Sequence, residues 1–582
     1  MYILGISCFY HDSAAVLIKD GKVVAAAEEE RFTRVKYDPA FPEKAIKFCL
    51  DYAGIKSKDL SYVGFYEKPF LKVERLLQTY LSRAPKGLPS FVEAIPTMAK
   101  EKLWIKSFIQ QKLGWEKEVI FIPHHLSHAA SSFLVSPFEK AAILTMDGVG
   151  EWQTTTWSFG EGNKIYLKGE INFPHSLGLL YSTFTYYCGF RVNSGEYKLM
   201  GLAPNGSPKY TRQIYKYLID VKSDGSFSLN MDYFNYEYAL KMIGSKFERL
   251  FGAPTLSPET LPHPQFYCDI AASIQQVTEE IILKMARSLY QKTKTPNLCL
   301  AGGVALNCVA NGRLLKEGPF KNIYVQPAAG DAGGALGTAF YIYNCLLNKK
   351  RVFVMDNAYF GPEFSESEIK KFLDRRKISY WQFKSEKIFL QKVADLLNQQ
   401  KVIGWFQGRM EWGPRALCNR SILADARSPQ MKDILNIKIK HREPFRPFAP
   451  VVMEEKISGC FDLSNPSPFM LFTAQVKSGY KGKIPAITHV DNSARIQSIS
   501  SKQNKLFYNL LKQFYKLTAC PLLVNTSFNT RGEPIVLTPE DAYNCFMGTG
   551  MDFLVLGNFL LDKAEMRVTT KDRQFSKSFS LD

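Results

Sequence analysis

The 582-residue chain contains no run of about 18 consecutive apolar residues, so the sequence predicts no membrane-spanning helix. Its first residues also lack a basic leader, and His11 and Asp12 interrupt their apolar pattern, so no secretory signal is expected. The eleven cysteines are an odd number without CxxC spacing, which argues against a dense disulfide framework and favours free thiols in a reducing compartment. We therefore expect a cytoplasmic protein.

Acidic residues are in short supply. The chain has 74 Lys and Arg against 55 Asp and Glu, a formal net charge of +19. This excess favours anionic partners such as nucleic acid, anionic lipid or phosphorylated small molecules, although a solvated basic surface explains it equally well. The apolar fraction of 46% and the charged fraction of 22% exclude a disordered chain. The length predicts two or three domains.

One pattern of strands and loops occurs twice in the first part of the chain. Residues 2–28 are predicted to form a strand, a polar loop, a strand, an Asp-Gly turn and a third strand. Residues 141–171 repeat this order, with the loop DGVGE after the first strand. The repetition predicts two related halves, and a short loop that carries Asp and Gly suits phosphate or metal binding.

The remaining elements predict an α/β fold class. Apolar residues recur at three and four within 273–293, which predicts a helix, and a strand with the glycine pair of AGGVALN follows. The pattern breaks near residue 355, after which Ser365 and Glu368 have the spacing of a helix-capping box. We therefore expect one domain at 1–355 and a second, α/β or α+β, domain at 356–582.

Three of the eight histidines fall within the string PHHLSHAASSF. His124 and His128 are four residues apart, so on a helix both side chains leave one face and can reach one metal ion. Asp147 and Asp331 each follow an apolar strand, one in each half. Two imidazoles and two carboxylates would suit Fe(II), Mn(II) or Zn(II) if the fold brings them together; otherwise the spacing is a coincidence. His125 is expected to be structural.

Long strings along nearly the whole chain resemble the O-carbamoyltransferases of the NodU/TobZ type, in that family's order. The N-terminal part contains HHLSHAASSF, MDGVGE, GEYKLMGLAP, AGGVALN and GDAGGALG, and the C-terminal part contains GPRALCNRSILAD, KHREPFRPFAP, THVDNSARIQ and NTSFNTRGEPIV. Two positions depart from the family: Cys418 stands where glycine is usual, and Asn205 where an aromatic residue is common.

The resemblance implies a fold and a reaction. It implies a duplicated actin-like, Kae-like domain fused to a YrdC-like domain. The YrdC-like domain would convert carbamoyl phosphate and ATP, with Mg²⁺, into carbamoyladenylate and pyrophosphate. The Kae-like domain would then transfer the carbamoyl group to a hydroxyl of a small molecule such as a sugar, an antibiotic or a nodulation-factor-like acceptor. A homodimer is expected from its frequency among oligomers.

The resemblance also implies site residues in the first domain. Iron, with manganese or zinc as alternatives, would be held by His124, His128, Asp147 and Asp331. His11 would be the general base, because imidazole titrates near neutrality. Lys36 would hold phosphate or carbamoyl oxygens.

A glycine-rich turn and the second domain supply the other implied residues. Gly302 and Gly303 would allow close approach to adenosine, and Asn307 would supply an amide contact. Carbamoyl phosphate and ATP would be bound by Arg415, Arg420, Lys440, Arg442, Arg446, Asn525 and Ser527. Arginine binds phosphate oxygens bidentately. Taken singly, each of these residues has a plainer interpretation as a steric turn, a polar turn or a solvated charge.

Two other functions remain open at this point. A tRNA-modifying enzyme of the threonylcarbamoyl type would use the basic charge for nucleic acid, but the basic residues do not form one stripe interleaved with aromatics. An actin-like regulator would bind nucleotide without catalysis. We therefore expect ATP, carbamoyl phosphate and a hydroxyl-bearing small molecule as partners, and neither nucleic acid nor membrane. The aromatics within 205–270 and 68–110 are candidates for an acceptor pocket.

Overall fold

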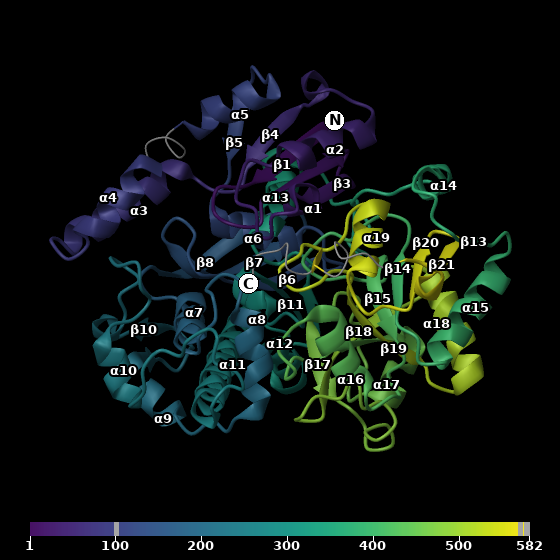
Figure 1. The fold of residues 1–582 in the computed structure, drawn as a ribbon. Helices are drawn as coiled ribbons and strands as arrows, with labels where there is room; N and C mark the ends of the chain where they lie inside the picture. The colour runs from purple at the N-terminus through teal and green to yellow at the C-terminus, as the bar shows by residue number, and fades with distance from the viewer. Residues whose placement is uncertain (98–103, 568–573, 576–582) are drawn as a thin grey trace. The chain divides into compact units, whose positions relative to one another are not determined.

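The structure, a computed structural model, describes residues 1–97, 104–567 and 574–575. The chain divides into two compact units (Figure 1). Unit 1 comprises Met1–Glu29 and Tyr37–Met355, and unit 2 comprises Glu30–Lys36 and Asp356–Asp582. The expected domain ranges placed residues 30–36 in the first domain, whereas their contacts place them in unit 2. Over the described ranges, no helix is both long enough and apolar enough to cross a membrane.

Unit 1 contains two five-stranded sheets of the same topology. The first has the order β3-β2-β1-β4-β5, and the second has the order β12-β11-β6-β7-β8. In each, an antiparallel three-stranded meander is followed by two strands parallel to its first strand. The bounds are β1 (Tyr2–Ser7), β2 (Ala14–Lys19), β3 (Lys22–Glu28), β4 (Tyr62–Phe65), β5 (Val119–Phe121), β6 (Lys140–Met146), β7 (Gln153–Glu161), β8 (Lys164–Asn172), β11 (Asn297–Ala301) and β12 (Asn322–Val325). The predicted duplication and the actin-like α/β fold class are confirmed.

Two helices lie between these sheets and pack against each other. Helix α13 (Ala332–Phe340) packs on β1 and β2, while α6 (His124–Phe133) packs on β6 and β11 and against α13. The contact between the helices depends on Gly337, because a Cβ there would lie 1.8 Å from the carbonyl oxygen of Ser127. The N-termini of both helices lie close together, since Nε2 of His124 at the start of α6 is 3.7 Å from Oδ1 of Asp331 directly before α13.

The other helices of unit 1 include the predicted one at 273–293, which lies within a longer helix, α11. Their bounds are α2 (Glu43–Ala53), α3 (Pro69–Ser82), α4 (Leu88–Thr97), α5 (Ile105–Leu113), α7 (Leu177–Tyr187), α8 (Glu196–Leu202), α9 (Thr211–Gln213), α10 (Ser245–Phe251), α11 (Gln265–Thr293) and α12 (Cys308–Glu317), with a small hairpin of β9 (Ile219–Val221) and β10 (Phe227–Leu229). Helix α11 packs against α7 and α12.

Unit 2 is built on a nine-stranded mixed sheet with the order β13-β21-β20-β14-β15-β19-β16-β18-β17. The strands are β13 (Trp381–Gln382), β14 (Ile403–Phe406), β15 (Arg420–Ala424), β16 (Ala449–Met453), β17 (Phe472–Gln475), β18 (Ser493–Ile499), β19 (Leu522–Ser527), β20 (Phe553–Leu556) and β21 (Phe559–Asp562). The helices are α1 (Glu30–Thr33), α14 (Glu366–Arg375), α15 (Glu386–Asn398), α16 (Met431–Asp433), α17 (Ile457–Cys460), α18 (Lys505–Thr518) and α19 (Pro539–Met547). The capping box predicted from Ser365 and Glu368 is confirmed at the start of α14.

Candidate active site

The histidines enter the site from the first turns of α6. Because the helix begins at His124, His124 and His128 lie one turn apart on one face, with ring centroids 4.5 Å apart. The backbone N–H of His124 donates to both carboxylate oxygens of Glu151, at 3.0 and 3.1 Å. The N–H of Lys68 donates to the same carboxylate at 2.7 Å. Glu151, which the sequence analysis did not single out, therefore anchors the start of α6.

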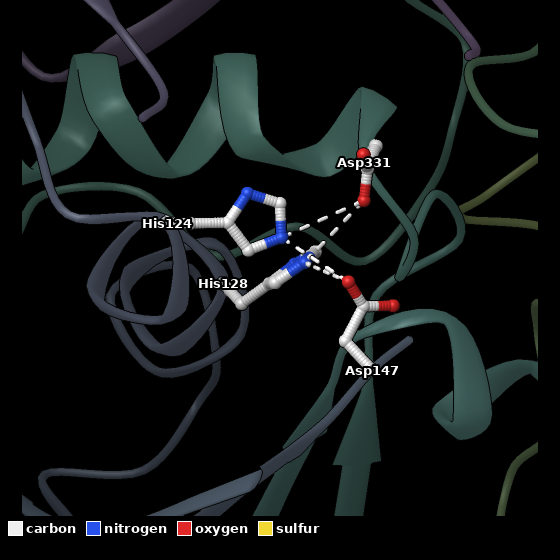
Figure 2. A group of neighbouring side chains, drawn as sticks. All are labelled: His124, His128, Asp147 and Asp331. Atoms are coloured by element: carbon white, nitrogen blue, oxygen red, sulfur yellow. Dashed lines mark hydrogen bonds and ion pairs between the residues drawn. The ribbon is translucent and has the colours of Figure 1, made fainter. Parts of the chain in front are cut away.

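Two carboxylates complete the cluster. Asp147 directly follows β6, and its Oδ2 lies 3.2 Å from His124 Nε2 and 3.7 Å from His128 Nε2. Asp331 directly precedes α13, and its Oδ1 lies 3.7 Å from both Nε2 atoms. Figure 2 shows the two carboxylates and the two rings pointing toward one another, and one ligand atom from each residue lies within 4.8 Å of the others. The fold thus brings together the four residues expected to hold a metal.

Burial and charge define the state of this cluster. All four residues are at most 8% exposed. Burial by itself would raise the pKa of Asp147, but the two histidines hold it well below its ordinary value. Burial would lower the pKa of His128, but Asp147 and Asp331 raise it to about 9. Asp147 and His128 therefore each stabilise the charged form of the other.

The cluster fits a divalent metal ion. In the part of the chain that the structure describes, neither ring nitrogen of His128 and neither carboxylate oxygen of Asp331 has a hydrogen-bond partner. Buried polar atoms without partners are costly, so a cation that engages them would stabilise the arrangement. Two imidazole nitrogens and two carboxylate oxygens are donors that Fe(II), Mn(II) and Zn(II) accept.

The two other residues predicted in the first domain, His11 and Lys36, lie in different units of the structure. His11 follows β1, and its Nδ1 lies 3.0 Å from Asp12 Oδ2. Burial would lower the pKa of His11, but Asp331 and Asp12 raise it to about 10, so His11 belongs to the electrostatic environment of the cluster. Lys36 is half-buried and lies in the segment that packs within unit 2.

The glycine pair supports Asp147. Gly302 has φ of +88°, and a Cβ there would lie 2.2 Å from the carbonyl oxygen of Met146. The N–H of Gly303 donates to Asp147 Oδ1 at 2.8 Å, which leaves Oδ2 directed at the histidines. The side chain of Asn307 caps α12 by accepting from the N–H of Ala310. These contacts give the turn a positioning role beside the predicted contacts to adenosine.

Unit 2 gathers positive charge around Lys440. Its Nζ donates to the carbonyl oxygen and the side-chain oxygen of Asn529, at 2.9 and 2.8 Å, and to the carbonyl oxygen of Ser527. Burial lowers the pKa of Lys440 well below its ordinary value, and the charges of Arg442 and Arg446 lower it further. A buried amine beside two guanidinium groups is an environment in which an anion is favoured.

Arg531 also belongs to this region. Glu443 Oε1 lies 3.4 Å from Arg531, and Oε2 of the same carboxylate lies 3.5 Å from Arg446. Arg531 lies in the string NTSFNTRGEPIV, but the sequence analysis did not select it. Its position four residues after Ser527 was the available signal.

Arg420 has a different role from the phosphate ligand that was predicted. Its side chain is fully buried, and its guanidinium donates to the carbonyl oxygens of Gln407, Asn419, Pro362 and Gly408, at 2.5 to 3.2 Å. Four backbone acceptors leave the terminal nitrogens no direction toward a ligand. Arg420 therefore holds the turn after β14.

The other predicted residues of unit 2 divide into two groups. Asn525 is 1% exposed and donates to Gln497 at 2.6 Å, and Arg442 donates through Nε to Asn436 at 2.8 Å, so both have protein partners. Arg415 is half-buried and makes no hydrogen bond or ion pair to any described residue. Arg415 therefore differs from Arg420 and Arg442, whose guanidinium groups donate to acceptors of the protein.

The chain is similar to known proteins over nearly its full length. It matches the family described as Carbamoyltransferase N-terminus over residues 2–340 and the one described as Carbamoyltransferase C-terminus over 394–563. The uncharacterized protein sll1178 of Synechocystis sp. is 52% identical, with 100% of both chains covered. The nodulation protein NolNO of Sinorhizobium fredii is 36% identical, covering 95% of this chain and 79% of that protein. The nodulation protein U of the same species is 29% identical, with 92% and 95% covered.

Proposed function

Because the chain belongs to the carbamoyltransferase family, and is therefore a transferase enzyme, we propose that it is an ATP-dependent O-carbamoyltransferase that modifies a hydroxyl group of a small molecule. The observation that carries the proposal is the buried cluster of His124, His128, Asp147 and Asp331, whose donor atoms face one another. The acceptor class is a sugar, an antibiotic or a molecule like a nodulation factor. Relatives named as nodulation proteins favour the last of these.

The proposed reaction has two stages, and its atom balance fixes the products. Carbamoyladenylate contains one phosphate, which comes from ATP. Carbamoyl phosphate must therefore lose its own phosphate to water. The first stage consumes carbamoyl phosphate, ATP and water and yields carbamoyladenylate, pyrophosphate and phosphate. In the second stage the acceptor hydroxyl attacks the carbamoyl carbon, the bond to the AMP oxygen breaks, and AMP and a proton are released. We assign the first stage to unit 2, as a YrdC-like domain, and the second to unit 1.

The residues of unit 1 prepare the second stage. The four cluster residues would hold a divalent ion, iron in this proposal, which supplies Lewis-acid polarisation and offsets the carboxylate charge that keeps a proton on His11. Gly303 fixes the orientation of Asp147, and Glu151 fixes the start of α6. Both contacts keep the cluster in one geometry before the substrate arrives.

His11 is the proposed proton acceptor. When its Nδ1–H donates to Asp12, Nε2 is the nitrogen that can take the proton of the acceptor hydroxyl. Gly302 and Gly303 are proposed to let the adenosine of the intermediate approach the backbone. Lys36 is proposed to hold a phosphate or carbamoyl oxygen. The proposal keeps the expected cytoplasmic location, which the eleven free cysteines favour, and the homodimer.

The residues of unit 2 prepare the first stage. Carbamoyl phosphate and the triphosphate of Mg²⁺-ATP repel each other, so their joint binding requires several cations. Arg415 offers an unpaired guanidinium, while Arg446 and Arg531 each pair with one oxygen of the Glu443 carboxylate. Ser527 accepts from Lys440 and supplies a hydroxyl at the end of β19. We propose that Arg415, Arg442, Arg446 and Arg531 bind the phosphates and that Lys440, Asn525 and Ser527 shape the floor of the site.

Product analysis of the purified protein tests this function. Incubation with Mg²⁺-ATP and carbamoyl phosphate should release pyrophosphate and phosphate in equal amounts, and omission of carbamoyl phosphate should stop both. Release of phosphate without pyrophosphate would indicate simple hydrolysis and would contradict the proposal. Binding of ATP with neither product would favour a nucleotide-binding regulator instead.

A further inference from the structure

The segment Glu30–Lys36 has an unusual place in the chain. In sequence it lies between β3 and α2, both of which belong to unit 1, yet it is grouped with unit 2 by its contacts. It forms the short helix α1 and leaves it at Arg34, whose φ is +60°. A non-glycine residue in the left-handed region is uncommon and needs support from its surroundings. The contacts of the Arg34 side chain supply that support.

The Arg34 side chain donates hydrogen bonds to three consecutive residues of one loop. Its Nη1 donates to the carbonyl oxygen of Ile535 at 2.7 Å, and its Nη2 donates to the carbonyl oxygen of Pro534 at 2.9 Å and to Glu533 Oε1 at 2.8 Å. Glu533 is 1% exposed, so this ion pair is largely removed from water. One guanidinium thus fixes the backbone and the carboxylate of residues 533–535 together.

Further hydrogen bonds extend from Glu533 to the part of the loop that carries Arg531. Glu533 Oε2 accepts from the N–H of Thr530 at 2.9 Å. The carbonyl oxygen of Glu533 accepts from the side chain of Asn529 at 2.7 Å, and Asn529 in turn accepts from Lys440 at 2.8 Å. Arg531 lies between these two anchored residues. A continuous set of hydrogen bonds therefore links Arg34 to the loop of Arg531 and to Lys440.

The same segment also holds the loop of Arg415. Nη2 of Arg31 donates to the carbonyl oxygen of Gly413 at 2.9 Å, and Gly413 has φ of +104°. The ring of Phe32 packs against a small cluster made of Met410, Ala416, Ile535 and Leu537. This cluster contains residues from both loops, so Phe32 joins them.

We propose that Glu30–Lys36 is a clasp that positions the two arginine-bearing loops of the first-stage site, with Arg34 as its main positioning residue. The inference rests on the proposed function, because it assigns these loops to carbamoyl phosphate and ATP. It goes beyond that function in making the first stage depend on seven residues that lie more than 300 positions earlier in the chain. Residues 356–582 alone would then lack part of their own site.

The test compares Arg34→Ala with Arg376→Ala in the full chain. Arg376 is an exposed residue of unit 2 that pairs with Glu540, so it controls for the loss of an arginine. Arg34→Ala should raise the KM for carbamoyl phosphate in pyrophosphate release on the order of tenfold to a hundredfold, because misplaced binding groups lose that much. Arg376→Ala should leave it unchanged. Arg34→Lys, which keeps the charge but not the planar fork, should fall between them.

A second measurement separates positioning from stability. Backbone hydrogen exchange at residues 529–536 should speed up in Arg34→Ala and not in Arg376→Ala, under conditions where both variants remain folded. A lowered melting temperature with wild-type KM and wild-type exchange would overturn the clasp and leave Arg34 as a stabilising contact. If the wild-type protein releases no pyrophosphate, the proposed function fails, whereas the exchange measurement still decides whether Arg34 holds the loop.

Discussion

The two candidate sites are built in opposite ways. In unit 1, the acidic and imidazole side chains of the cluster face one another, and several of their polar atoms have no other partner among the described residues. In unit 2, Lys440, Arg420 and Arg442 are already held by backbone and side-chain acceptors. A buried set of donor atoms that face one another without other partners fits a cation. A set of cations that the protein has already paired indicates a scaffold that presents only a few groups to an anion.

The supporting elements differ in the same sense. The cluster residues of unit 1 lie in the first turns of α6, directly after β6 and directly before α13, and core packing fixes all three elements. The charged residues of unit 2 stand on loops around 409–418, 440–448 and 527–536. Loops need additional contacts to hold a geometry. The clasp is such a contact for the loops of unit 2, whereas the cluster of unit 1 is supported by contacts close to it, from Glu151 and Gly303.

The largest expected effect is a loss of metal affinity in unit 1 that leaves the reaction assigned to unit 2 unchanged. Asp331→Asn removes one of two carboxylates from a buried ligand set, so the affinity for the divalent ion should fall at least about 100-fold. Metal content after dialysis measures this loss. Pyrophosphate release should persist, because no cluster residue lies in unit 2. Asp269→Asn, which removes a carboxylate paired with Lys209, is the control and should retain metal.

The second prediction separates scaffold from ligand within unit 2. Arg420→Met should lower the free energy of unfolding by ~3 kcal/mol or more, because four buried carbonyl oxygens lose their donor. Arg415→Met should change it by only ~0.5 kcal/mol while raising the KM for carbamoyl phosphate. Urea denaturation and steady-state kinetics measure the two quantities. Equal destabilisation by both substitutions would show that Arg415 is part of the scaffold.

The third prediction compares the carboxylates of the two units through pH. The pKa values of Asp147 and Asp331 are lowered, whereas burial raises the pKa of Glu533 from 4.5 to about 7, against the opposing effect of Arg34. A raised pKa of Glu533 means that the folded protein binds more protons than the unfolded chain between pH 4.5 and about 7. Below about pH 4.5 the Glu533 carboxyl is protonated in both states and does not change the free energy of unfolding. As the pH rises through 7, its ionisation lowers the free energy of unfolding by ~3 kcal/mol.

The variant Glu533→Gln measures this pH-dependent loss of stability. The free energy of unfolding of the wild type should fall relative to the variant by ~3 kcal/mol between pH 4.5 and 8, as followed by urea denaturation at each pH. The groups around Glu533 are Arg34, Asp541, Cys545 and Lys440, and all of them remain in the variant. A difference that does not change with pH would mean that the carboxyl titrates near its ordinary value.

The smallest expected effect concerns Cys418, where the resemblance described above led us to expect glycine. Its φ is +88°, a conformation that strains any side chain with a Cβ. Cys418→Gly should therefore be more stable than Cys418→Ala by ~1 kcal/mol, the reverse of the usual order within strands and helices. Thermal unfolding of the two variants checks the sign. Greater stability of the alanine variant would show that no strain is stored at this position.

Local spacing and strand order made unit 1 largely predictable. His124 and His128 were recognisable from their spacing, and Asp147 and Asp331 from their positions at strand ends in a duplicated pattern. Unit 2 was less predictable, because the role of an arginine depends on which acceptors surround it. Arg420 and Arg415 lie five residues apart in one string, but only the first is enclosed by carbonyl oxygens. Contacts across hundreds of residues, such as those of Arg34 and Glu533, leave no local pattern.

The most direct test of two sites with separate tasks is pyrophosphate release in the presence of ATP and carbamoyl phosphate, measured for wild type, Asp331→Asn and Arg446→Ala. The account predicts release by the wild type and by Asp331→Asn, in each case dependent on carbamoyl phosphate, and a loss of release in Arg446→Ala. Loss of release in Asp331→Asn while Arg446→Ala remains active would contradict the assignment of the two stages to the two units.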